Sequence, residues 1–104
     1  MFATIRRYDG VDQNRTTELT TKVTETLVPK LSKLPGFSGY YLIEAGNGVW
    51  SSLGLFATPE QGKESTNVVA TWIRDERLET LIPNEPKITS GQVVARSREH
   101  ALVA

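Results

Sequence analysis

Cysteine is absent from this chain of 104 residues, and histidine occurs only once, as His100. Without cysteine the chain has no disulfide, no thiolate nucleophile and no cysteine-ligated metal. A transition-metal site usually takes several histidine, cysteine or carboxylate ligands, and one histidine in a C-terminal tail cannot supply them. The same histidine is the only base for a Ser-His-Asp triad. We therefore expect no metal and no bound cofactor.

The chain also lacks an excess of charge of either sign and has no long apolar run. Twelve Lys and Arg residues balance twelve Asp and Glu residues, so the formal net charge is zero. Such a chain lacks the basic footprint that binds nucleic acid or an anionic membrane surface. No apolar stretch is long enough to span a bilayer or to form a signal peptide. We expect a soluble, cytoplasmic protein without nucleic-acid or membrane partners, folded as one domain over residues 1–104.

Two apolar runs joined by a glycine-rich turn make residues 39–57 the most informative stretch. The turn is Gly46-Asn47-Gly48, and an Asn-Gly pair tolerates the positive φ angles of a tight hairpin. We predict two antiparallel strands here, at the centre of a small sheet. Alternating or β-branched residues predict two further strands, Phe2–Tyr8 and Ile88–Arg96.

Two helices are expected between these strands. Leucine and valine recur at three- and four-residue spacings from about Asp12 to Leu34, which places them on one helical stripe. Pro29 lies inside this pattern and predicts a kink just before it. Thr58 and Gln61 form a capping-box pattern at the start of a second helix, which we expect to end near Arg74. A short helical continuation is expected to carry Leu78, Leu81 and Ile82.

This order of elements predicts an α+β, ferredoxin-like fold: βαββαβ, with a four-stranded antiparallel sheet and both helices on one face. Alternation divides the strand at residues 49–56 into two faces. One face suits packing beneath the helices and carries Val49, Leu53 and Leu55. The other alternates large and small residues, as the wall of a cavity does, and carries Trp50, Ser52, Gly54 and Phe56.

The register of the hairpin has two solutions. A two-residue turn pairs Tyr41 with Gly54 and puts Tyr41 and Ile43 on the cavity face. A three-residue turn puts Tyr40, Leu42 and Glu44 there instead, because a one-residue shift flips the strand. We favour the two-residue turn, which keeps Glu44 off an apolar wall.

The sheet face without helices is expected to carry Trp50, Phe56 and a tyrosine. That much apolar surface is unusual on a monomer. A homodimer that presses two such faces together is the simplest way to cover it.

Several of these segments together resemble a known superfamily. They are Leu34-Pro35-Gly36-Phe37, Tyr40-Tyr41-Leu42-Ile43, Gly46-Asn47-Gly48, Phe56 and Thr58-Pro59-Glu60. Over residues 2–96 the chain is similar to the dimeric α/β-barrel superfamily, and more narrowly to small bacterial proteins grouped with the antibiotic-biosynthesis monooxygenase domain. The resemblance implies a homodimer of face-to-face sheets and a small apolar or aromatic ligand. Relatives include cofactor-independent monooxygenases of aromatic polyketides and quinols, haem-degrading enzymes, lactone isomerases and members without a known reaction.

Six residues are candidates for the ligand pocket: Arg6, Tyr41, Trp50, Ser52, Phe56 and Trp72. Arg6 can bind a carboxylate or enolate oxygen, because a guanidinium is always charged. Its alternative is an ion pair with Glu44 or with an acidic residue of the partner subunit. Glu44 is the only candidate base, and it also fits an exposed hairpin edge.

The two tryptophans also have two interpretations. In some relatives a tryptophan helps to activate the substrate toward oxygen, and the resemblance implies this role for Trp50 or Trp72. Trp72 fits the core better, because Val69 and Ile73 accompany it at helical spacing. Trp50 competes with a role at the dimer interface.

Three functions stay open at this point. The resemblance implies a cofactor-free monooxygenase of a small aromatic or quinol-type substrate. A non-catalytic ligand-binding or stress-related dimer is the second. An isomerase or lyase of an acidic cyclic substrate, with Arg6 as the anion anchor, is the third.

Overall fold

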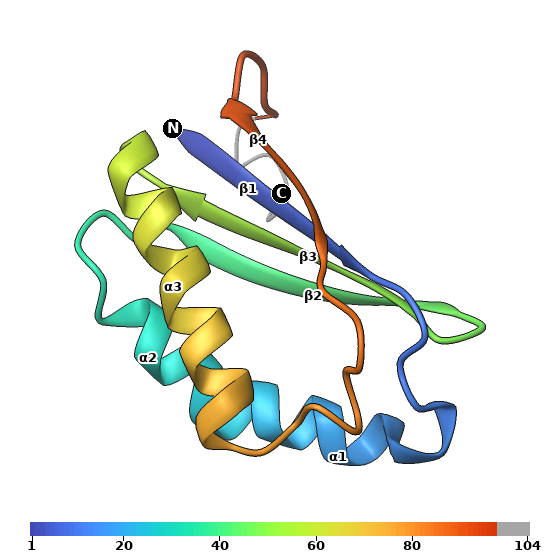
Figure 1. Cartoon of the computed structure of the whole chain (residues 1–104). Coiled ribbons are helices and arrows are strands. Elements are labelled where there is room, and N and C mark those ends of the chain that lie inside the picture. Colours follow the sequence, from blue (N-terminus) through green and yellow to red (C-terminus); the bar gives the residue numbers. More distant parts are fainter. Residues whose placement is uncertain (98–104) are drawn as a thin grey trace, which may run out of the picture.

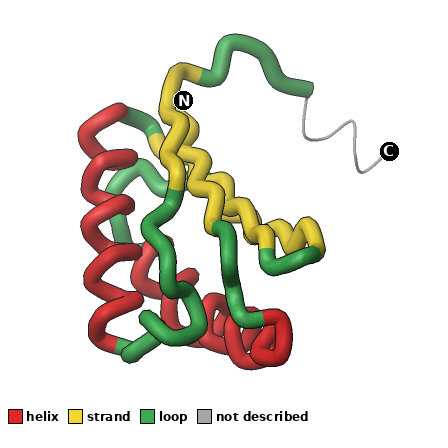
Figure 2. Tube along the Cα trace, turned by 45° about the vertical axis from the view of Figure 1, so that its right-hand side comes forward, coloured by secondary structure: helices red, strands yellow, loops and turns green. Residues whose placement is uncertain are grey.

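The computed structural model describes residues 1–97 as one antiparallel sheet with helices on one side. The strands are β1 (Phe2–Tyr8), β2 (Gly39–Gly46), β3 (Val49–Phe56) and β4 (Lys87–Gln92), in the spatial order β2-β3-β1-β4 (Figure 1). Figure 2 shows the helices in red as a layer beside the yellow strands. The predicted ferredoxin-like α+β fold is confirmed. No helix within residues 1–97 is long and apolar enough to cross a bilayer.

The first helical segment is irregular. A 3-10 turn (η1, Gln13–Arg15) leads into α1 (Thr16–Lys22), a π-helical turn (η2, Val23–Leu27) and α2 (Val28–Ser32). Proline has no N–H and its ring crowds the preceding turn, so regular α-helical hydrogen bonding cannot continue across the turn before Pro29. The disturbance predicted just before Pro29 is therefore found as the π-helical turn.

The second long helix, α3 (Pro59–Asp75), begins with the predicted capping box. The Gln61 N–H donates to Thr58 Oγ1 at 3.3 Å, and the Thr58 N–H donates to Gln61 Oε1 at 3.1 Å. The predicted helical continuation is wrong: residues 76–86 form a loop, because Arg77 takes a left-handed φ of 55° that ends the helix. Its apolar residues, Leu78, Leu81 and Ile82, are nevertheless buried.

The last strand is shorter than predicted. It ends at Gln92, whose partner Phe2 is the first residue of β1, so the chain beyond Gln92 has no strand to pair with. Val94, which lies within the predicted range Ile88–Arg96, is 93% exposed.

The hairpin combines both predicted registers. Gly46 pairs with Val49 across the two-residue turn Asn47-Gly48, whose residues have φ of 56° and 76°. A bulge between Glu44 and Gly46 then shifts the register by one residue, so that Tyr40, not Tyr41, pairs with Gly54. The turn was predicted correctly, but the preferred orientation of the strand was wrong.

The predicted faces of β3 are also reversed. Trp50, Ser52 and Phe56 are buried beneath the helices, whereas the residues between them are partly exposed. The large side chains of Trp50 and Phe56 fill the space between the sheet and the helices. The open face instead carries Ile5, Tyr41 and Ile43, which are 42%, 60% and 53% exposed.

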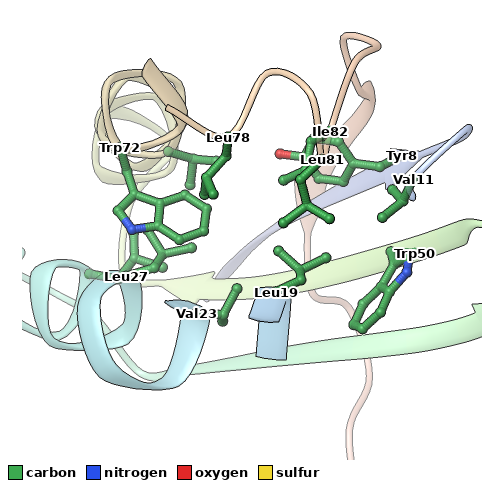
Figure 3. Packing of buried hydrophobic residues seen from close by; sticks show 12 residues of the cluster. Tyr8, Val11, Leu19, Val23, Leu27, Trp50, Trp72, Leu78, Leu81 and Ile82 are labelled. Carbon is green, nitrogen blue, oxygen red and sulfur yellow. The ribbon is translucent and has the colours of Figure 1, made fainter. Parts of the chain in front are cut away.

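The hydrophobic core lies between the helix layer and the sheet (Figure 3). Trp72 extends from α3 toward Leu27, and Trp50 extends from β3 beside Leu19. Trp72 is 2% exposed, and its Nε1–H donates to Thr26 Oγ1 at 2.7 Å. The structure thus agrees with the core interpretation of Trp72.

Candidate functional site

A buried arginine lies at the centre of the candidate site. Arg6 lies between Thr4 and Tyr8 on the face of β1 that points toward α3. Only 1% of the residue is exposed. Its Nη2 donates to Ser65 Oγ and to Thr66 Oγ1, each at 2.9 Å. The guanidinium is therefore held against the middle of α3.

The two hydroxyl groups are oriented by the helix backbone. Ser65 Oγ donates to the Gly62 carbonyl oxygen at 2.6 Å, and Thr66 Oγ1 donates to the same oxygen at 3.4 Å. Each hydroxyl proton is thereby directed to the carbonyl, which leaves its lone pairs for Arg6. Gly62 also lets α3 approach β1, because a Cβ at this position would lie 2.8 Å from the Phe2 ring.

Arg6 has no anionic partner within residues 1–97. The ion pairs found there involve Arg7, Arg15, Lys22 and Arg74 instead. Arg6 Nε is buried and has no hydrogen-bond partner among these described residues. Burial lowers the pKa of Arg6, and the nearby Tyr8 and Tyr40 oppose this shift. An arginine nevertheless stays protonated in a protein, so the site holds a fixed positive charge without a counterion.

Two phenols accompany this charge. Burial raises the pKa of Tyr8 to about 12, and Arg6 partly opposes the shift. Burial also raises the pKa of Tyr40, against the influence of Ser52 and Arg6. Both phenols are therefore neutral at pH 7 and cannot neutralise Arg6.

A cavity of about 380 Å³ opens beside Arg6, between α3, β1 and the loop of residues 76–86. This volume is within the range of small-molecule sites. Its lining is mainly apolar and includes Val69, Ala70, Ile73 and Ile82. Polar and charged side chains at the cavity are Arg6, Tyr8, Thr66, Glu79, Asn84 and Glu85. We call this space the Arg6 cavity.

The predicted site residues lie in three different places. Arg6 lines the Arg6 cavity, and Ser52 is its cross-strand partner in β3 but does not line the cavity. Tyr41 is on the open face of the sheet. The three remaining aromatic candidates lie in the interior beneath the helices: Trp50, Phe56 and Trp72. Glu44 is exposed on the hairpin and forms no ion pair with Arg6.

Sequence reasoning missed several residues of the Arg6 cavity. Tyr8 could have been found, because it is two residues from Arg6 on the same strand face. Thr66, Glu79 and Glu85 could not, because their positions depend on how α3 crosses β1 and on the path of the following loop. Within residues 1–97 no three His, Cys, Asp or Glu side chains gather as a metal site, and His100 lies outside the described residues.

Comparisons with solved structures show the same fold in proteins of low sequence identity. A crystal structure of a monooxygenase from the gene ActVA-Orf6 of Streptomyces coelicolor, in complex with Nanaomycin D, has a TM-score of 0.70 and 14% identity; the match covers 93% of this chain and 90% of that one. A MhuD mutant with two manganese protoporphyrin IX bound per active site has a TM-score of 0.73, 15% identity and coverage of 94% and 99%.

A dimeric ferredoxin-like protein from an uncultured marine organism has a TM-score of 0.66, 17% identity and coverage of 93% and 97%. No protein-family profile matches the chain, and no curated protein matches it. These likenesses confirm the predicted resemblance to antibiotic-biosynthesis-monooxygenase-like proteins at the level of the fold.

Proposed function

We propose that the protein is a cofactor-independent, monooxygenase-like enzyme that binds a small aromatic molecule through an ionised oxygen beside Arg6. The observation that carries this proposal is the buried Arg6 charge, which faces an apolar cavity and has no anion within residues 1–97. A carboxylate, phenolate or enolate oxygen would complete its hydrogen bonds and neutralise its charge. The apolar lining suits the aromatic body of such a molecule.

The same arrangement suits a reaction in which the substrate supplies the electrons. Arg6 would favour the ionised form of a phenol or enol, which is the electron-rich form that reacts with oxygen. One oxygen atom of O₂ would enter the ring, the other would leave as water, and the hydroxyarene would become a quinone. Glu79 and Glu85 are the carboxylates at the Arg6 cavity and are the candidates for taking up the substrate proton.

The comparisons support this choice among the three functions. The Streptomyces coelicolor protein has the same fold and is a monooxygenase crystallised with Nanaomycin D. The cavity here lies between sheet and helices and is large enough for a small aromatic molecule. We infer the reaction type from this likeness and the binding chemistry from Arg6.

We also propose a homodimer that forms through the open face of the sheet. Ile5, Tyr41 and Ile43 expose large apolar side chains there, and Leu53 and Leu55 lie on the same face. Sheet faces of this kind are normally covered. The dimeric ferredoxin-like protein of the same fold supports such an assembly.

Oxygen consumption with anthrone tests the proposed reaction. Anthrone forms an enolate, and its oxidation by one O₂ gives anthraquinone and one water. The wild-type protein should accelerate oxygen uptake, and Arg6→Met should abolish the acceleration. Arg74→Met is the matched control, because the Arg74 side chain is 73% exposed on α3 and does not line the Arg6 cavity. It should behave like the wild type.

Calorimetry with benzoate separates the outcomes. Benzoate binding that requires Arg6, without oxygen uptake, would reject the oxygenase and favour the acid-binding alternatives. If the wild type does not bind benzoate, or if Arg6→Met binds it as tightly as the wild type, the proposed site itself is wrong.

Light scattering tests the proposed dimer. The wild type should have twice the chain mass of 11.5 kDa. Tyr41→Lys places a charge on the open face and should shift the protein toward the monomer. A wild-type protein that stays at the monomer mass at micromolar concentration would contradict the proposed assembly.

A further inference from the structure

A second hollow adjoins the Arg6 cavity where Thr66 and Ile88 line both spaces, and we call this place the neck. The second hollow has a volume of about 390 Å³ and lies toward the start of α3, where Phe2, Gly62 and Ser90 line it. The two spaces are therefore neighbouring parts of one trough between α3 and β4, with Thr66 on one wall and Ile88 on the other.

The chemistry of the neck distinguishes this trough from an ordinary surface groove. Thr66 Oγ1 accepts a hydrogen bond from Arg6, so the buried charge lies directly at the neck. Ile88 is the cross-strand partner of Arg6 in β4, and it is 47% exposed although it lies on the helix side of the sheet. The buried cation and a half-exposed apolar side chain thus both lie next to the neck.

The trough exists because α3 does not cover β4. Gly62 brings the first half of α3 close to Phe2 and Thr4 in β1, on the near side of the trough. Every residue of β4 is exposed, and Ser90 contributes only a small side chain on the helix side. A ligand that covers Ile88 and extends past Ser90 would fill the space that the fold leaves open.

We propose that the ligand is an elongated apolar acid that occupies both hollows: its acidic oxygen binds Arg6, its first ring fills the Arg6 cavity and a second apolar arm passes between Thr66 and Ile88 into the second hollow. This inference rests on the proposed function, because it requires an acid at Arg6. Each hollow alone is near the small end of the size range of ligand sites, whereas the two together accommodate a larger molecule.

Two carboxylic acids with the same head group test the inference by calorimetry. Benzoate has one ring and fits the Arg6 cavity alone. meta-Biphenylcarboxylate carries a second ring to one side of the carboxylate, where it can reach through the neck. The wild type should bind meta-biphenylcarboxylate at least about tenfold more tightly than benzoate, because the second ring is removed from water.

Ser90→Trp decides where the second ring binds. The new indole should fill the second hollow, reduce the preference for the longer acid to within about threefold and leave the affinity for benzoate unchanged. Asn67→Phe fills the same hollow from α3 and should act in the same way, so the test does not depend on one variant. Thr71→Trp is the control, because Thr71 is exposed on α3 and lines neither hollow.

The results separate failure of this inference from failure of the proposed function. If the wild type binds both acids equally and both require Arg6, the second hollow is not a subsite but the Arg6 site stands. The extended site is also rejected if Ser90→Trp and Asn67→Phe lower the affinity for both acids by the same factor. It is rejected as well if these variants change the affinity for neither acid. If neither acid binds the wild type, the proposed function and this inference both fail.

Discussion

Replacement of Arg6 by methionine should make the fold more stable while it removes the ligand site. Arg6 is 1% exposed, and burial lowers its pKa. A basic group whose pKa is lower in the folded state than in the unfolded state destabilises the fold at every pH below the folded-state pKa, which includes pH 7. Methionine has a similar length, carries no charge and fills irregular spaces.

The magnitude follows from two opposing contributions. A charge buried without a counterion costs several kcal/mol, and the two hydrogen bonds to Ser65 and Thr66 return about 1.5–3 kcal/mol each. Arg6 Nε has no partner and no carboxylate pairs with Arg6 within residues 1–97, so we expect the cost to exceed the return. Both hydroxyls also donate to the Gly62 carbonyl, and we expect these bonds to remain when Arg6 is replaced. We expect the free energy of unfolding to rise by about 1–3 kcal/mol.

Urea unfolding followed by tryptophan fluorescence measures this change. Trp50 and Trp72 are 5% and 2% exposed, so their emission should report the loss of the core. The protein concentration must be held fixed, because dimerisation would contribute to the stability. The midpoint should rise without a change in slope, and Arg74→Met should stay within about 0.5 kcal/mol of the wild type. A loss of more than about 1 kcal/mol in Arg6→Met would refute the reasoning and make Arg6 a structural residue.

Three further expectations follow from the contacts described above. Thr58→Ala removes half of the capping box and should lower the free energy of unfolding by about 1 kcal/mol in the same urea assay; an unchanged value would mean that the cap contributes nothing. Trp72→Phe removes the hydrogen bond to Thr26 Oγ1 and some buried area, and should lower the free energy of unfolding by about 1–3 kcal/mol. A change no larger than the roughly 0.5 kcal/mol of an exposed substitution would contradict this expectation. Because the pKa of Tyr8 is raised to about 12, the fold should lose stability as the pH rises from about 10 to 12, and Tyr8→Phe should reduce this slope.

The regular parts of the fold were predictable from local chemistry. The spacing of leucine and valine located the first helix, Thr58 with Gln61 located the start of α3, and Asn47-Gly48 located the hairpin turn. Each of these signals depends on residues close together in the sequence. The ferredoxin-like order of elements followed from them.

The faces of the sheet were harder to predict, because they depend on contacts distant in sequence. A run that alternates aromatic and small residues can line a cavity or a core, and only the position of the helices decides between them. In β3 the large aromatic residues Trp50 and Phe56 fill the core. The bulge beside Gly46 leaves no clear signal in the sequence, yet it orients all of β2.

The candidate site was found only in part for the same reason. Alternation in β1 sends Arg6 and Arg7 to opposite faces, so one inward-pointing arginine was predictable. Its partners Ser65 and Thr66 are about sixty residues away. Part of the loop that closes the Arg6 cavity was predicted as helix, so Glu79 was placed on the wrong kind of element.

The bulge in β2 also bears on how this protein can diverge. Alternate residues of one strand serve two surfaces: Tyr40 faces the interior near Arg6, and Tyr41 faces the open side where a second subunit is proposed to lie. Point substitutions can therefore alter ligand chemistry and assembly independently. Loss of the single residue Ala45 would exchange the two sets of side chains at once. A homologue with a hairpin one residue shorter would thus differ in both properties together, and alignment gaps at Ala45 would mark where such lineages separate.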